Sequence, residues 1–271
     1  MSPRALWLFL GVTFAITWGI AAALLAFPEQ LTALFGELSY TNPLYILATW
    51  APAVAAFALV WRHHGLRGIG SFVRRLTLWR MAGPWWVFLL LGIPGLYYLG
   101  AAIAGTITDP FPYSPWYTVL PAMAIMLTLG PVEEFGWRGV ALPLLQRRFT
   151  PLTAGVLVGA VWGVWHLPAF FLGGTPHADW AFAAFFIGVV GLSVLMTAMF
   201  NAARGSLLIP VLFHFQINLP AWPESAPWGM LLFAAAAAVV VVVNPSALLS
   251  RERAATHILM PADEAAADAK R

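Results

Sequence analysis

The sequence contains no cysteine and very little charge. The absence of cysteine excludes disulfides, thiol nucleophiles and Cys-based metal sites. Only 9% of the 271 residues are Asp, Glu, Lys or Arg, whereas a soluble domain has about 25%, so an ordinary soluble protein is also excluded. The net charge of +3 comes from basic residues scattered between apolar runs rather than striped on one face. That pattern argues against nucleic-acid binding.

Familiar catalytic and binding signatures are missing as well. The chain has no Gly-x-Ser-x-Gly elbow, no His-Glu-x-x-His and no phosphate-binding loop. Gly68-Ile-Gly70 is no dinucleotide fingerprint, because no strand–helix unit surrounds it. Any chemistry must therefore be carried by polar residues inside the apolar runs.

The sequence is rich in long apolar runs. With 61% hydrophobic residues, it predicts an all-α, polytopic membrane helix bundle of about eight transmembrane helices, in a single domain over residues 1–271. The first run is too long for a typical signal peptide and is interpreted as an uncleaved span. Residues 244–271 are polar and Ala-rich and predict a short amphipathic or disordered cytoplasmic tail. The eight apolar runs cover residues 5–27, 44–61, 84–104, 116–145, 152–172, 180–200, 206–219 and 227–243.

The basic residues sort by side of the membrane. If the N-terminus is inside, every Lys and Arg except Arg138 falls on the cytoplasmic side, including a basic loop at 62–80 and the Lys270-Arg271 end. The distribution predicts an integral protein of a plasma membrane, expected to be bacterial, with both termini cytoplasmic. His63 and His64 are expected to be solvated in the inner loop, and His177 in an outer loop.

The stretch Gly130–Arg138 places three charges inside an apolar run. Facing lipid, Glu133, Glu134 and Arg138 would together cost on the order of 8 to 10 kcal/mol, so they must face protein or a watery cavity. Glu134 and Arg138 are spaced i,i+4 and can form an ion pair on one helix face. Glu133 diverges from Glu134 by about 100° and is aimed at a neighbouring helix. A buried salt-bridge cluster that only stabilises helix packing is the simpler interpretation. Such a cluster needs one acid for its one Arg, however, and this stretch has two.

Two histidines lie in later apolar runs. His166 follows Trp162 at i+4, and His214 precedes Asn218 by the same spacing, so each pair shares a helix face. A lone histidine in an apolar helix is more often a packing residue than a ligand. Together with the surplus Glu133, however, three helices offer four groups that can bind metal or move protons: Glu133, His166, His214 and Asn218.

These motifs resemble a known family. Glu133-Glu134-x-x-x-Arg138, Trp162-x-x-x-His166 and His214-x-x-x-Asn218 are similar in order and spacing to the marks of the CAAX-protease and bacteriocin-processing (Abi, CPBP) intramembrane proteases. The similar core covers residues 116–222. Trp162 stands where the family usually has Phe, a change that keeps an aromatic wall.

The resemblance implies an intramembrane endopeptidase, metal-dependent or glutamate-dependent. Glu133 and His166 would prepare the hydrolytic water, and His214 with Asn218 would bind metal or stabilise the oxyanion. Glu134 and Arg138 would be the supporting pair.

The implied cofactor is a divalent metal, expected to be zinc, with Glu133, His166 and His214 as ligands. The implied partners are membrane lipid and a peptide or lipidated peptide. Two alternatives remain: a non-catalytic immunity or scaffold protein of the same fold, and a proton-coupled transporter, since buried Glu, Arg and His also mark proton relays. The lack of an internal repeat counts against the transporter.

Overall fold

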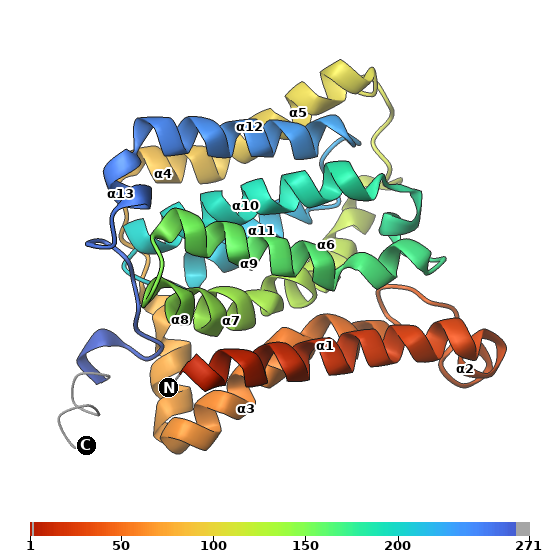
Figure 1. Ribbon diagram of the computed structural model, residues 1–271. Helices are drawn as coiled ribbons and strands as arrows, with labels where there is room; N and C mark the ends of the chain where they lie inside the picture. Colours follow the sequence, from red (N-terminus) through yellow and green to blue (C-terminus); the bar gives the residue numbers. More distant parts are fainter. Residues whose placement is uncertain (2, 264–271) are drawn as a thin grey trace.

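The computed structural model describes residues 1 and 3–263, and over that part of the chain it contains helices and no strands. Figure 1 shows the helices running roughly along one common direction, as in a membrane bundle. In chain order they are α1 (Pro3–Ala26), α2 (Pro28–Phe35), α3 (Pro43–Val73), α4 (Gly83–Val87), α5 (Ile93–Ala104), α6 (Val119–Thr128), α7 (Glu134–Gly136), α8 (Leu142–Gln146), α9 (Pro151–Trp165), α10 (Phe182–Ala202), α11 (Leu208–Ile217), α12 (Trp228–Val243) and α13 (Pro245–Leu249).

The predicted all-α, polytopic architecture is confirmed. Six helical stretches among the described residues are long and apolar enough to cross a membrane, and α11 and α12 are shorter apolar helices. The ten residues of α11 rise about 15 Å, half of the hydrocarbon thickness of a bilayer. The eight expected spans are thus six of full length and two short ones. The six long stretches are Arg4–Ala26, Pro43–Thr77, Gly83–Ala104, Trp116–Gln146, Pro151–Phe171 and Phe182–Ala202.

Helix α10 lies at the centre of the bundle and packs against α9 and α12. A Cβ on Gly155 or Gly159 of α9 would come within 2.8 Å of a side chain of α10, so only glycine permits this approach. The Ser193 hydroxyl of α10 donates to the Gly155 carbonyl at 2.7 Å. Small residues therefore let α9 and α10 pack closely.

The fourth apolar run is a broken helix. α6 ends at Thr128, Leu129 leaves helical geometry, and a 3-10 turn covers Gly130–Glu133. After α7 the chain widens into a π-helical stretch, Trp137–Ala141, before α8. The break at Leu129 places Glu133 in the protein interior, where irregular backbone at membrane depth is tolerated.

One expectation at the end of a span is wrong, and of the two alternatives for the tail the disordered one does not hold for the described residues. The basic stretch 62–80 is not a loop throughout, because α3 continues to Val73 across a kink at Gly65, whose φ is 62°. The described part of the tail is also ordered against the bundle: α13 is followed by a segment in which Ile258 and Leu259 are buried. The Lys270-Arg271 end lies outside the described residues.

Candidate active site

Glu133 sits at the end of the 3-10 turn that breaks the fourth span. Its side chain is 3% exposed, and its Oε2 accepts a 2.8 Å hydrogen bond from Trp162 Nε1 of α9. The sequence predicts that this carboxylate turns away from Glu134 toward a neighbouring helix, and the bond to Trp162 confirms that direction.

Glu134 and Arg138 form the predicted i,i+4 ion pair. Arg138 Nη1 lies 3.0 Å from the Glu134 carboxylate, and both side chains are fully buried. Glu134 Oε1 also lies 2.7 Å from His214 Nδ1, which joins the pair to α11. The guanidinium carbon of Arg138 stands 4.9 Å from the centre of the Trp162 ring, in cation–π range. Glu134 therefore neutralises the charge of Arg138, and Glu133 is not needed as the partner of this cation.

His166 closes the C-terminal end of α9. Its Nδ1 lies 2.9 Å from the Trp162 carbonyl oxygen, an acceptor, so Nδ1 carries the hydrogen and Nε2 keeps a lone pair in the neutral ring. The Trp162 ring stands with its centre 5.7 Å from the His166 ring and 5.3 Å from the His214 ring. One indole therefore contacts both histidines and holds Glu133.

His214 and Asn218 share one face of α11, as their spacing predicts. Both side chains approach Gly130: a Cβ at this position would lie 2.0 Å from Asn218 Nδ2 and 2.6 Å from His214 Nε2. Only a residue without a side chain fits here. Gly130 therefore permits the closest approach between the broken span and α11.

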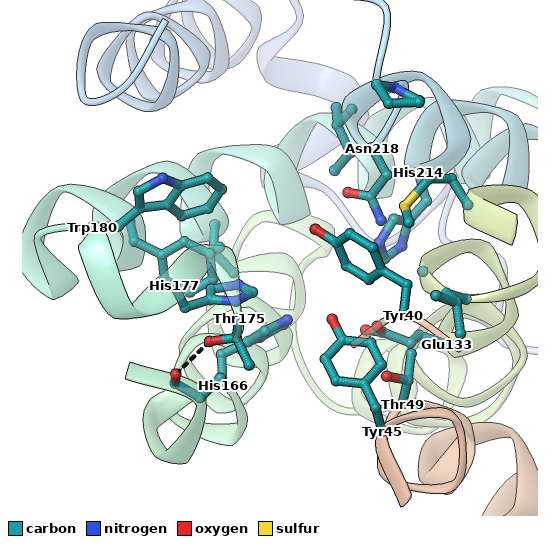
Figure 2. A pocket seen from close by; sticks show the side chains of 18 of the residues that line it. Tyr40, Tyr45, Thr49, Glu133, His166, Thr175, His177, Trp180, His214 and Asn218 are labelled. Atoms are coloured by element: carbon teal, nitrogen blue, oxygen red, sulfur yellow. Dashed lines mark hydrogen bonds between the residues drawn. The ribbon is translucent and has the colours of Figure 1, made fainter. Parts of the chain in front are cut away.

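The four predicted catalytic residues line one cavity of about 640 Å³. Figure 2 shows His166, His177 and Trp180 on one side of it, and Glu133, His214 and Asn218 on the other, with Tyr40 and Tyr45 near Glu133. The rest of the wall is largely apolar. Glu134 and Arg138 lie behind this wall and do not line the cavity.

His177 lines the cavity, although its place between two apolar runs predicts a solvated side chain. It was expected to be solvated, but its ring packs against Phe170, Trp180 and Phe185 and stands 5.3 Å from the His166 ring. Burial lowers the pKa of His177 to about 4. No local signal identified it, because the contact depends on the 3-10 turn Pro176–Asp179 folding back over the end of α9.

The arrangement does not fit the predicted three-ligand zinc site. Among the described residues, no three His, Asp or Glu side chains lie close enough together to hold one metal ion. Glu133, His166 and His214 share the cavity, and both histidines make Nδ1 hydrogen bonds within the protein, as metal-binding histidines also do, so it is only the spread of the three side chains that does not fit. Zinc requires ligand atoms within about 2.0–2.2 Å of one point.

Comparisons with known proteins confirm the predicted resemblance. Residues 115–220 match the family model described as "Type II CAAX prenyl endopeptidase Rce1-like". A relative named CAAX prenyl protease 2, from Methanococcus maripaludis, is 31% identical over 106 residues, which are 37% of this chain and 39% of that protein. The match thus spans well under half the length of this relative, and the stretch that matches the family model, residues 115–220, includes all three motifs of this chain.

Proposed function

We propose that this protein is an intramembrane endopeptidase that hydrolyses a peptide bond of a membrane-associated substrate. One observation carries the proposal: two adjacent glutamates have separate tasks. Glu134 is committed to Arg138 and His214. Glu133 is held at one oxygen by Trp162 and lines a cavity large enough for a peptide segment.

Glu133 is the general base. A water molecule beside its second oxygen, Oε1, gives up a proton to the carboxylate while the water oxygen attacks the scissile carbonyl carbon. The lone pair on His166 Nε2 accepts the other hydrogen of this water and orients it. When the tetrahedral intermediate collapses, the carbon–nitrogen bond breaks and the proton held by Glu133 passes to the leaving amine.

Asn218 and His214 support the opposite side of the reaction. The Asn218 Nδ2 group donates to the oxygen that becomes negative as water adds, and a preorganised donor in a cavity that excludes bulk water is effective there. His214 is oriented by Glu134 through Nδ1, so its Nε2 faces the same region.

The substrate class follows from the wall of the cavity. Aromatic and aliphatic side chains such as Tyr45, Leu172 and Phe233 surround the few polar groups, so an extended apolar peptide or a lipidated peptide fits best. The name of the relative describes a protease for CAAX prenyl substrates, which belongs to the lipidated kind. Each step described above uses only side chains of this chain.

The test is a comparison of protein termini in membranes. Cells producing the wild type and cells producing Glu133→Gln at equal levels are analysed for new N-termini by mass spectrometry. Gln keeps the size of Glu and can still accept the Trp162 hydrogen bond, so it removes the base and leaves the fold. New termini that depend on Glu133 support the endopeptidase. Identical termini favour the non-catalytic scaffold, in which the cluster only fixes packing.

A further inference from the structure

The cavity has an open end and a closed end, and the two ends differ in charge. Resting on the endopeptidase proposed above, we infer that the cavity opens on the non-cytoplasmic face of the membrane. Its substrates are therefore peptides whose scissile segment lies on that side. A cytosolic lipidated protein does not reach this mouth.

The open end is built from the four loops that join helices at one pole of the bundle. From the catalytic residues the cavity wall continues to Leu38 and Tyr40 before α3, Tyr113 before α6, and Glu224 before α12. Thr175 and His177, between α9 and α10, complete this rim. In Figure 1 this pole is the end at which α2 lies. A substrate that enters between these loops meets Glu133 directly.

The opposite pole is sealed by buried polar contacts. Arg75, fully buried, donates to the carbonyl oxygens of Gly139, Gly205 and Ile258 at 2.9–3.0 Å. Gln146 and Asn201 exchange two amide hydrogen bonds, which join α8 to α10. These residues draw the ends of α3, α8 and α10 and the segment after α13 together.

The sealed pole is also the basic one. Arg147 donates to the backbone oxygens of Met1 and Thr256, and Arg74 pairs with Asp263 at 2.5 Å, so the N-terminus and the C-terminal segment lie there together. The mouth loops, residues 27–42, 105–118, 172–181 and 218–227, contain no Lys or Arg. Because Lys and Arg in short loops mark the cytoplasmic side, the sealed pole is cytoplasmic and the mouth faces outward.

Cysteine labelling tests this directly, because the native chain has no cysteine to interfere. Ser39→Cys and Ser246→Cys place one thiol in an exposed position at the mouth and at the sealed pole, respectively, and Thr49→Cys places one in the cavity wall. Spheroplasts producing each variant are treated with a sulfonated maleimide, with and without detergent. Ser→Cys and Thr→Cys change little volume, and total thiol in detergent verifies that each protein is present.

Ser39→Cys and Thr49→Cys are expected to react in intact spheroplasts at least about tenfold faster than Ser246→Cys, since a charged reagent crosses the bilayer poorly. Ser246→Cys should react only after permeabilisation. Faster reaction of Ser246→Cys in intact spheroplasts would overturn the orientation, and a Thr49→Cys thiol that reacts only after detergent would overturn the outward opening. Labelling requires no hydrolysis, so this result stands apart from the termini comparison that tests the endopeptidase.

Discussion

The indole Nε1 of Trp162 donates a 2.8 Å hydrogen bond to Glu133 Oε2 across 29 positions of sequence. This bond links α9 to the break in the fourth span. It also fixes which carboxylate oxygen remains available to water. Since the same ring contacts His166 and His214, Trp162 positions most of the proposed catalytic group.

Trp162→Phe removes this hydrogen bond and keeps an aromatic ring. A hydrogen bond to a charged group contributes about 1.5–3 kcal/mol, so the cleavage rate should fall about 10- to 100-fold without being abolished. Trp50→Phe is the matched control, because it removes the indole hydrogen bond to the Thr128 carbonyl oxygen on an exposed part of α3. The measurement is kcat for each purified variant. Equal rates for wild type and Trp162→Phe would show that the bond does not position Glu133.

Arg138→Ala leaves the buried Glu134 without its cation. Breaking a buried pair costs about 3–5 kcal/mol, so the folded yield and the stability of Arg138→Ala should fall well below those of His166→Ala. Size-exclusion chromatography and thermal unfolding in detergent measure the difference. Adding Glu134→Gln to Arg138→Ala should recover part of the loss. Equal yields for Arg138→Ala and His166→Ala would contradict the role of the pair.

Gly130→Ala introduces a Cβ that would lie 2.0 Å from Asn218 Nδ2. The Asn218 side chain must then move, so activity should fall about 100-fold, the loss seen when one oxyanion donor is removed. Gly95→Ala in α5 is the control, since nothing lies within 4 Å of its Cβ. Comparable kcat values for Gly130→Ala and Gly95→Ala would show that Asn218 does not act as the oxyanion donor.

The lowered pKa of His177 predicts how the stability of the folded protein changes with pH. Its folded-state pKa of about 4 lies below the ordinary value near 6.5, so in this window the unfolded chain binds more protons than the native one. Stability from this group is present above about pH 6.5 and is lost as the pH falls toward 4. His177→Phe should therefore lose less Tm than the wild type between pH 7 and pH 4.5. If Tm falls equally with pH in the wild type and in His177→Phe, the His177 side chain is solvated and this account of it is wrong.

The sequence predicted the local relationships within the site well. The i,i+4 pair of Glu134 and Arg138, the divergent Glu133 and the shared face of His214 and Asn218 all follow from helical geometry. Such features depend on residues a few positions apart, which is why periodicity identifies them.

Contacts between distant segments were not predictable in this way. The bond from Glu134 to His214 joins residues 80 positions apart, and the placement of His177 depends on a loop folding over α9. Ile258 and Leu259 are buried because the segment after α13 returns to the bundle, whereas its composition left an amphipathic and a disordered tail both open. These contacts depend on how distant segments pack in the folded protein, which a pattern of residues a few positions apart does not specify.

The central claim is that Glu133 is the base that activates water, and the single-turnover cleavage rate of Glu133→Gln tests it most directly. The purified wild type and this variant are reconstituted in liposomes with the same peptide, identified from the membrane termini, and the product is followed by mass spectrometry. Removing a general base should lower the rate by about 100-fold or more, while the unfolding temperature stays near that of the wild type. A Glu133→Gln variant that cleaves at the wild-type rate would contradict the mechanism.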